Sequence, residues 1–423
     1  MKIDNNIYNT FLDWNMFFAK GLEKNTQKYF FSNLVNSIQQ NNNKLNLYVH
    51  WFFCKSECIY CPYLKQLGKL DNNKLEENVN KIKKDLNDFI DYLNEINIDS
   101  KTIKIDTISY GGWTPSYIPY KYLESITKFL IEKFDFNPKE FTIEINPTIE
   151  DYNNILPLKK YWLNRISIGV QTFNKDITIK TWRWLKNKGV ENVIKQAYND
   201  FWNVNIDMIY WLPEQTKEIL KNDLKKILEL ERYISHISYY PLYIFPWTSL
   251  YNNFNLFKKK LPFYNFSLEW LDIKTNEKKK GWYDYNKIIE WWEIINNTLN
   301  KNFDFYTMDY LVNKKDTNKK HLYQIEYLKN KPLYSLWYWY WWTYNTFMND
   351  HQYYIYKSWT DVLLKDILLW IRLFNLDLLE KNLNIKNIED ILNLKIEDIF
   401  KEVKNNNFYN QYYLQSYFLS KLK

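Results

Sequence analysis

Residues 47–61 read LYVHWFFCKSECIYC, a β-favouring stretch that leads directly into a cysteine loop. The loop carries Cys54, Cys58 and Cys61, which are the only cysteines among 423 residues. Three cysteines within eight residues exclude a disulfide framework as the organising principle of the fold. Thiolates are the ligands of iron–sulfur clusters and also bind zinc. This clustering of all the cysteine in one loop after a strand therefore indicates a metal centre.

The spacing Cys-x3-Cys-x2-Cys favours a [4Fe–4S] cluster over a structural zinc ion. Most clusters use four thiolates, so a loop that supplies three leaves one iron open to a ligand that is not protein. Structural zinc sites usually draw pairs of ligands from separate turns, whereas these three cysteines share one tight loop. The zinc alternative, with His50 as a fourth ligand, stays open at this point.

Outward from the loop, strand-like and helix-like segments alternate over residues 47–251. The clearest helix is predicted over residues 73–96, where apolar side chains recur at three- and four-residue spacing. Repeated β–α units imply parallel strands joined by right-handed crossovers. The predicted strands are residues 47–51, 103–109, 141–145, 165–170, 204–209 and 237–244.

Chemically unusual residues follow the C-terminal end of every predicted strand. They are the cysteine loop, Gly111 and Gly112, Glu144 and Asn146, Gln171, residues 207–213 and residues 246–248. The C-terminal ends of parallel strands meet at one rim, where barrel enzymes collect their sites. A rim supplied by every strand favours an α/β fold of the partial (β/α)6 barrel type over an open doubly wound sheet.

The sequence predicts three parts. These are an N-terminal helical segment (1–45), a core barrel (46–255) and a mostly helical C-terminal accessory or lid domain (256–423). No run of 18 apolar residues exists, so no transmembrane segment is expected. The first 20 residues lack the apolar core of a signal peptide, and the cytoplasm is the default location. The net charge of +8 comes from scattered lysines without a basic stripe, so nucleic-acid binding is not expected.

Glycine is scarce and tryptophan is abundant in this chain. It has 7 Gly and 19 Trp, whereas average usage predicts roughly 30 glycines for this length. Several tryptophans stand in turn sequences where glycine is usual, as in GGWTP (111–115), YWLP (210–213) and FPWT (245–248). We infer that a stop codon recoded as glycine has been translated as tryptophan. The alternative is a protein that is simply rich in aromatic residues.

The cysteine loop and four later segments together resemble the oxygen-independent coproporphyrinogen III oxidase family, which is a radical S-adenosylmethionine (SAM) family. The later segments are SYGGWTPS (109–116), IEINP (143–147), NRISIGVQTF (164–173) and NIDMIYWLPEQT (205–216). The resemblance covers about residues 45–250, with the motifs in the family's order. The family has glycine at the positions that match Trp113, Trp162, Trp182, Trp211, Trp247 and Trp370, in agreement with recoding.

The resemblance implies two cofactors, a [4Fe–4S] cluster on the three cysteines and SAM on its open iron. In the family, one electron from the cluster cleaves SAM to a 5′-deoxyadenosyl radical, and the protein positions the cofactors. By resemblance, the turn of Gly111, Gly112, Trp113 and Thr114 contacts the SAM amino group. Without the resemblance, this turn reads as an ordinary βα connection.

The remaining SAM contacts are also implied by resemblance. Glu144 suits a ribose hydroxyl or a cationic group, although a carboxylate there can also pair with a lysine. Gln171 and Asp207 match family residues that contact SAM, and an unpaired Asp207 in a buried strand would be costly. Arg183 matches the arginine that pairs with the SAM carboxylate, a contact that a lysine would imitate poorly. Tyr48 matches a catalytic-site tyrosine beside the sulfonium, but a strand tyrosine is more often part of a core.

Three functions within this family remain open from the sequence. The oxidase decarboxylates propionates of coproporphyrinogen III and has a further cysteine, which is Tyr63 in this chain. The haem chaperone binds haem through a His-Asn-x-x-Tyr-Trp motif, of which His321 and its neighbours keep only part. The anaerobic haem-degrading methyltransferase has a glycine-rich segment that residues 332–343 resemble if their tryptophans are glycines. An oxidase-like enzyme is the favoured interpretation, with a tetrapyrrole or haem as substrate and flavodoxin or ferredoxin as the reductant.

Overall fold

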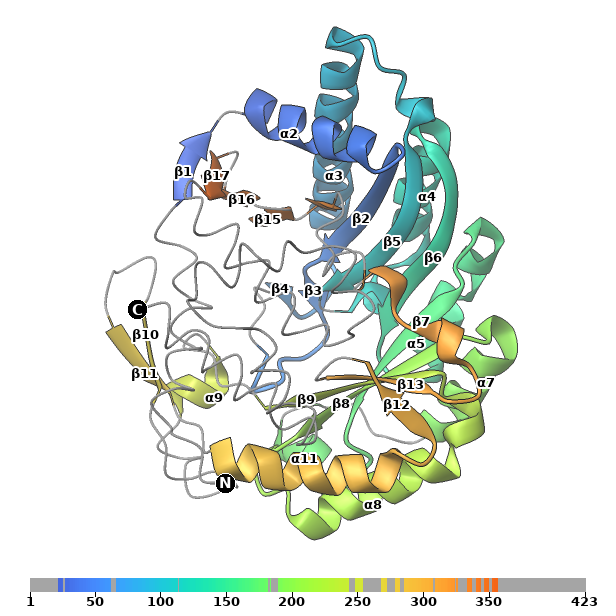
Figure 1. Cartoon of the computed structure of the whole chain (residues 1–423), viewed down its shortest axis with the longest axis vertical. Helices are drawn as coiled ribbons and strands as arrows, with labels where there is room; N and C mark the ends of the chain where they lie inside the picture. Colours follow the sequence, from blue (N-terminus) through green and yellow to red (C-terminus); the bar gives the residue numbers. More distant parts are fainter. Residues whose placement is uncertain are drawn as a thin grey trace, which may run out of the picture.

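The computed structural model shows a curved sheet wrapped by helices (Figure 1). It describes residues 22–25, 27–61, 66–112, 114–181, 183, 189–242, 248–253, 268–271, 278–281, 285–306, 309–323, 325, 333–336, 340–343, 346–349 and 352–356.

The six predicted strands all form, and they lie side by side in the order of the sequence. They are β2 (Lys44–Trp51), β5 (Lys104–Gly112), β6 (Asp135–Ile145), β7 (Arg165–Gln171), β8 (Val204–Tyr210) and β9 (His236–Pro241). All five pairings between them are parallel. The sheet stays open at its two edges, so the predicted α/β fold with a partial barrel is confirmed. Strand β9 ends three residues before its predicted end, and residues 243–247 lie outside the described part of the chain.

Helices follow the strands and pack against the outer face of the sheet (Figure 1). They are α3 (Asn72–Glu95), α4 (Tyr120–Lys133), α5 (Ile149–Ile155), α6 (Lys175–Lys180), α7 (Val190–Phe201) and α8 (Lys217–Glu229), while the short α9 (Ser249–Asn252) lies against the cysteine loop. The longest, α3, matches its predicted range to within one residue at each end. Asp71 caps it, because its carboxylate accepts hydrogen bonds from the backbone N–H groups of Asn73 and Lys74. Among the described residues, short 3-10 turns stand between the longer elements at Ser100–Thr102, Pro115–Tyr117, Leu156–Tyr161, Glu231–Tyr233 and Thr317–Lys319.

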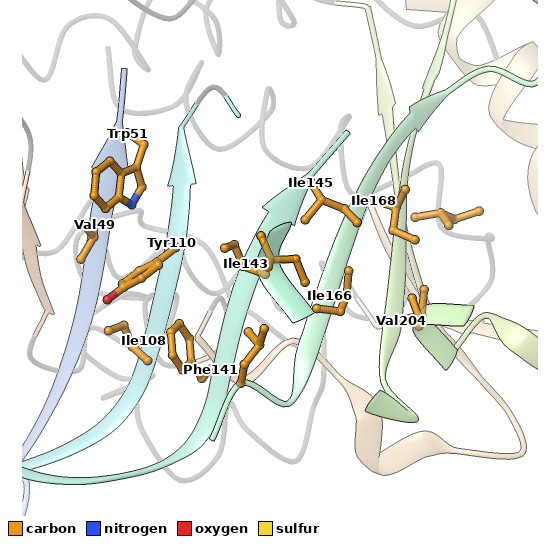
Figure 2. Close-up of a cluster of buried hydrophobic side chains, with 14 of the residues drawn as sticks. Val49, Trp51, Ile108, Tyr110, Phe141, Ile143, Ile145, Ile166, Ile168 and Val204 are labelled. Atoms are coloured by element: carbon orange, nitrogen blue, oxygen red, sulfur yellow. The ribbon is translucent and has the colours of Figure 1, made fainter. Parts of the chain in front are cut away.

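Every second side chain of the sheet is apolar and buried beneath these helices. Figure 2 shows ten of them, from five neighbouring strands: Val49, Trp51, Ile108, Tyr110, Phe141, Ile143, Ile145, Ile166, Ile168 and Val204. A strand alternates its side chains between two faces, so these residues fix which face of each strand meets the helices.

The alternate side chains, which face the inside of the barrel, are mostly polar and yet buried. They include Asn46, Thr107, Glu140, Thr142, Arg165, Ser167, Asn205, His236 and Ser238. Buried polar groups are stable only when they are hydrogen-bonded, as where Thr107 Oγ1 donates to Asn46 Oδ1 at 2.7 Å. The inside of the barrel is therefore a polar network, and it leads toward the rim where the strands end.

Strands from beyond residue 256 extend both edges of this sheet. They are β12 (Phe303–Phe305), β13 (Tyr310–Asn313) and β14 (Leu333–Leu336). Strand β13 pairs antiparallel with β9, while β14 pairs parallel with β2. Within the described residues the sheet has nine strands, ordered β12-β13-β9-β8-β7-β6-β5-β2-β14. A part of the chain that was predicted to form a separate domain thus completes the core sheet, and the boundary at residue 255 stays a prediction.

Smaller elements surround the main sheet. They are β1 (Leu22–Asn25), α2 (Gln27–Gln40), β3 (Phe53–Cys54), β4 (Gln66–Leu67), β10 (Leu268–Leu271), β11 (Lys278–Gly281), α11 (Tyr285–Leu299), β15 (Tyr340–Thr343), β16 (Thr346–Asn349) and β17 (Gln352–Tyr356). Strand β1 joins β15–β17 in a four-stranded sheet. The segment 256–423 was predicted to be mostly helical. Its last part, residues 357–423, lies outside the described part of the chain. None of the described helices combines the length and apolarity that crossing a bilayer requires.

Three tryptophans adopt left-handed backbone angles. Their φ values are 66° at Trp162, 56° at Trp202 and 74° at Trp211. Glycine adopts such angles readily, whereas a bulky residue there is an outlier. Trp162 and Trp202 also stand directly after the last residue of a helix or 3-10 turn, where glycine is the usual choice. The backbone therefore supports the interpretation that these tryptophans replace glycines.

Candidate functional site

A cavity of about 500 Å³ lies at the rim formed by the C-terminal ends of the strands. Nine of the predicted site residues line it: Cys54, Cys58, Cys61, Gly112, Thr114, Glu144, Gln171, Arg183 and Asp207. They come from β3, β5, β6, β7 and β8 and from the loops that follow these strands. Residues spread over 150 positions of sequence thus converge on one site, as strand-end placement predicts.

Backbone hydrogen bonds hold the cysteine loop over the cavity. The Ile59 N–H donates to the Thr181 carbonyl at 3.1 Å, and the Leu250 N–H donates to the Ile59 carbonyl at 2.7 Å. Cys54 Sγ lies 2.9 Å from the Ser56 carbonyl and 3.5 Å from Thr114 Oγ1. Burial raises the pKa of the Cys54 thiol above its ordinary value. A cation beside it would reverse this shift, since metal ligands bind as thiolates.

The donor set fits an iron–sulfur cluster better than a single zinc ion. Within the described residues, no three His, Cys, Asp or Glu side chains converge closely enough to hold one metal ion. The three cysteines nonetheless line the same cavity, as the ligands of a larger, multi-iron cluster would. His50, the fourth ligand of the zinc alternative, lies beneath Gly112 and places its Nδ1 3.2 Å from the Tyr48 hydroxyl.

The last two residues of β5, Gly111 and Gly112, lead into the turn after this strand, and both positions require glycine. A Cβ on Gly111 would stand 2.7 Å from Glu144 Oε1 and 2.8 Å from the ring of Tyr48. Gly112 has a φ of +108°, and a Cβ there would stand 2.7 Å from the ring of His50. Its N–H donates to Glu144 Oε2 at 3.1 Å. The turn therefore brings the backbone close to the cavity wall in a way that no other residue type allows.

Two carboxyl groups face the cavity without a lysine or arginine partner within salt-bridge distance among the described residues. Burial, and next the charge of the nearby Asp207, raise the pKa of Glu144 to about 8. Burial also raises the pKa of Asp207, while hydrogen bonds from Ser167 Oγ (2.9 Å) and Asn205 Nδ2 (2.8 Å) oppose that shift. A ligand with N–H or O–H donors, or with positive charge, would relieve the cost of burying both groups.

Arg183 supplies positive charge beside the cysteines. Its Nη2 donates to the Gly169 carbonyl, and its Nη1 lies 3.8 Å from Cys58 Sγ. Its Nε is buried and has no hydrogen-bond partner in the described part of the chain. A Cβ on Gly169 would meet Arg183 Nη2 at 3.0 Å, so this glycine makes room for the guanidinium. The arrangement suits an anionic group in the cavity.

Gln171 lies at the rim of the barrel and has unusual backbone angles. It ends β7 with a φ of 66°, in the left-handed region that non-glycine residues seldom adopt. The next residue, Thr172, donates its hydroxyl to Asp223 Oδ2 at 2.8 Å and thereby secures the turn. Strained backbone of this kind often marks a functional site, and here it turns Gln171 toward the cavity.

The remaining predicted site residues are not found in the lining of the cavity that the described residues form. Tyr48 lies under the glycine turn, and its ring stacks on Tyr323 with centroids 6.0 Å apart. Neither Tyr48 nor Gly111 lines the cavity, and Trp113 lies outside the described residues.

Sequence reasoning missed two tyrosines that line the cavity. Tyr240 of β9 donates its hydroxyl to that of Tyr310 of β13 at 3.0 Å, and both line the cavity. Their rim position depends on the pairing of β13 with β9, which no sequence motif signals. The strand-like alternation of residues 237–244 offered the only hint of Tyr240.

Residues 48–227 match a family model, that of the radical SAM superfamily. The heme chaperone HemW of Buchnera aphidicola (subspecies Acyrthosiphon pisum) is 31% identical over 210 residues, which are 49% of this chain and 53% of that protein. The HemW of Bacillus subtilis is 30% identical over 48% of this chain and 52% of its own length. The oxygen-independent coproporphyrinogen III oxidase of Escherichia coli is 29% identical over 44% of this chain and 39% of its own. The chain spans about half the length of the curated relatives it matches.

The fold is also that of a solved structure. Coproporphyrinogen III oxidase (HemN) from Escherichia coli superposes with a TM-score of 0.63 at 19% identity, covering 88% of this chain and 84% of that one. This likeness extends beyond residue 227 and concerns the fold alone.

Proposed function

We propose that this protein is a radical SAM enzyme that acts on a tetrapyrrole, because residues 48–227 match the radical SAM superfamily, whose members bind a [4Fe–4S] cluster and SAM. The favoured activity is that of an oxygen-independent coproporphyrinogen III oxidase, the oxidative decarboxylation of propionates. One observation carries the proposal. Three cysteines, two carboxyl groups and a buried arginine line the same cavity at the strand ends.

The residues divide the binding task by their chemistry. Cys54, Cys58 and Cys61 would hold the cluster and leave one iron open. The bound cofactors would supply the one-electron chemistry, and the protein would hold them in place and exclude water. A reductant such as flavodoxin or ferredoxin would provide the electron.

The polar groups of the cavity match the groups of SAM. Glu144 and the backbone around Gly112 and Thr114 would accept and orient the amino group, next to the turn that contains Gly111 and Trp113. Arg183 would pair with the carboxylate through its buried guanidinium. Asp207 and Gln171 would bind the ribose hydroxyls. Tyr48 would act indirectly, because it packs beneath the glycine turn.

The second candidate is a haem chaperone, because several of the curated relatives are named heme chaperone HemW. Haem binding by this chain through His321 would require rearrangement. The His321 side chain is only 15% exposed, and it lies 3.5 Å from Glu140 inside the barrel. The haem-degrading alternative depends on residues 332–343, most of whose side chains lie outside the described part of the structure.

Anaerobic reconstitution followed by product analysis tests the proposal. The full chain, with glycine restored at Trp113 in a parallel sample, would be incubated with SAM, reductant and coproporphyrinogen III. We expect 5′-deoxyadenosine and a decarboxylated porphyrinogen. Stoichiometric haem binding without any SAM-dependent product would favour the chaperone instead. A purified protein that carries zinc and no oxygen-sensitive brown chromophore would refute the cluster itself.

A further inference from the structure

A chain of four hydrogen bonds connects the segment after the barrel to Asp207. The His321 N–H donates to the Tyr306 hydroxyl at 3.1 Å, and this hydroxyl lies 2.5 Å from His236 Nε2. His236 Nδ1 lies 2.5 Å from Asn205 Oδ1, and Asn205 Nδ2 donates to Asp207 Oδ1 at 2.8 Å. The middle of this chain is fully buried, since His236 and Asn205 are at most 1% exposed.

The direction of every bond follows from the Asp207 carboxylate. Asn205 must turn its NH2 toward Asp207, because the flipped amide would set oxygen against oxygen. Its Oδ1 therefore faces His236, so His236 Nδ1 must carry the proton. His236 Nε2 is then the acceptor, and the Tyr306 hydroxyl must donate to it. Ser238 Oγ supports this orientation by donating to the same Asn205 oxygen at 3.1 Å.

A buried arginine keeps His236 in this neutral form. Arg165 Nη2 lies 3.4 Å from His236 Nδ1, and since both nitrogens are donors the contact is not a hydrogen bond. Burial, and next the charge of Arg165, lower the pKa of His236 well below its ordinary value. The tautomer is thus fixed, and all four bonds donate toward Asp207.

We propose that Tyr306 and His236 are positioning residues that hold Asp207 in its ligand-binding orientation, so that the segment after the barrel sets the affinity of the cavity for SAM. The proposal rests on the proposed role of Asp207 as a SAM ligand. Hydrogen bonds that donate in one direction polarise one another, so loss of a distant member weakens the last bond. Ser167 and Asn205 each occupy one contact on a different oxygen of Asp207, and the Ser238 side chain adds a third, so the carboxylate keeps a lone pair for a ligand.

Tyr306→Phe tests the proposal, because it removes the donor to His236 and leaves the ring. We expect SAM binding by the anaerobically reconstituted full chain to weaken about fivefold, with unchanged iron content. The matched control is Tyr334→Phe, which removes another hydroxyl from the same part of the chain. Tyr334 donates to the Asp85 carbonyl at 3.1 Å, away from the cavity. Equal SAM affinity of both variants and the parent protein would overturn the proposal.

Two substitutions of His236 separate positioning from packing. His236→Asn can place its amide N–H where Nδ1 donates to Asn205, but it loses the contact with Tyr306, so SAM affinity should fall only about as much as in Tyr306→Phe, about fivefold. His236→Gln places its amide near Nε2 and loses that donor, and we expect about a tenfold loss of affinity. A merely structural role predicts that the larger, more similar glutamine is tolerated at least as well. This comparison decides the question if Tyr306→Phe does not fold.

Asp207→Asn separates this inference from the proposed function. If Asp207→Asn leaves SAM affinity unchanged, Asp207 is not a ligand and the proposed function of the site is at fault. If it weakens SAM binding while Tyr306→Phe and His236→Gln do not, Asp207 is a ligand that needs no positioning, and only the inference fails.

Discussion

At the scale of single residues, the conflict between residue type and backbone angles is greatest at Trp162, Trp202 and Trp211. We predict that peptides of the native protein covering these positions carry glycine. The physical reason is that a left-handed φ costs a bulky residue about 1 kcal/mol or more relative to glycine. Mass spectrometry of protein from its own organism checks this, and tryptophan at all three positions would contradict it.

A stability comparison tests the same point on recombinant protein. Trp202→Gly should raise the melting temperature, because Trp202 is 63% exposed and follows helix α7 with a φ of 56°. Trp291→Gly is the control, since Trp291 is 3% exposed within helix α11. It should lower the melting temperature through the cavity and the poor helix propensity of glycine. If both substitutions shifted the melting temperature in the same direction, the backbone angles would no longer support glycine at position 202.

Glu144 carries a stability cost that depends on pH. Its pKa is about 8 in the folded protein, above the ordinary 4.5. A raised folded-state pKa favours folding below about pH 4.5, and this contribution is lost as the pH rises from about 4.5 to 8. Glu144→Gln should therefore melt higher than the parent apoprotein, by a margin that widens from pH 5 to pH 8. Thermal melts across this range measure the margin.

The control for this experiment is Glu132→Gln. Glu132 is exposed and pairs with Lys133 at 2.8 Å, so its substitution should change the melting temperature little at any pH in the range. A constant margin for Glu144→Gln would show that its carboxyl titrates near its ordinary value. We also expect Glu144→Gln to bind SAM more weakly, because the stabilised fold lacks the ligand-binding carboxylate.

At the scale of elements, the turn after β5 depends on glycine for two separate reasons. Gly112 and Gly68 both have a φ above +100°, but only Gly112 lacks space for a Cβ. Gly68→Ala should cost about 1 kcal/mol of unfolding free energy from backbone strain alone. Gly112→Ala should cost more, because its Cβ would also meet His50 and the Trp51 carbonyl. Chemical denaturation compares the two variants.

Binding measurements complete the comparison of these turns. We expect Gly112→Ala to lose SAM binding, since the turn and Glu144 move together, and Gly68→Ala to retain it. Equal effects of the two substitutions on stability would mean that the turn relaxes around the added methyl group.

The elements that the sequence predicted are those whose pattern is local. Strand β7 and helix α3 follow their alternating or helical periodicity to within one residue. Strand β6 begins at Asp135, six residues before its predicted start. Its first residues include Asp135, Asn137 and Pro138, which do not read as strand, yet Asp135 and Phe136 pair with β5. Tertiary pairing overrides local preference there.

The candidate site was predictable where chemistry follows a strand directly. The cysteines stand out because the whole sequence has only these three in one loop, and Glu144 and Asp207 stand out because carboxylates are rare in buried strands. Tyr310 and the hydrogen bonds of Tyr306 were not predictable, because they join β9 to a segment 70 residues further along the chain. No local pattern encodes such a contact.

At the scale of the whole molecule, strands from beyond residue 255 belong to the same sheet as the barrel strands in the described part of the chain. A chain truncated after residue 255 would lose β13 from one edge of the sheet and β14 from the other. Exposed edge strands pair with other chains. We predict that this truncated protein aggregates or melts well below the full chain, as light scattering and thermal melts would show.

The control for truncation keeps these strands. A chain that ends after residue 356 retains β12 to β17, and we expect it to remain monomeric if the full chain is monomeric. A truncation at residue 255 that stayed monomeric and equally stable would establish the predicted domain boundary instead.

The parallel pairing of β14 with β2 has a consequence during synthesis. Strand β2 leaves the ribosome early, but its partner β14 is translated only after most of the chain. At ordinary elongation rates the interval is on the order of tens of seconds. During this interval, β2 forms an edge of the nascent barrel that has no strand paired with it. An uncovered strand edge can pair with other chains, so we expect the yield of native protein to fall when elongation between residues 51 and 333 is slowed.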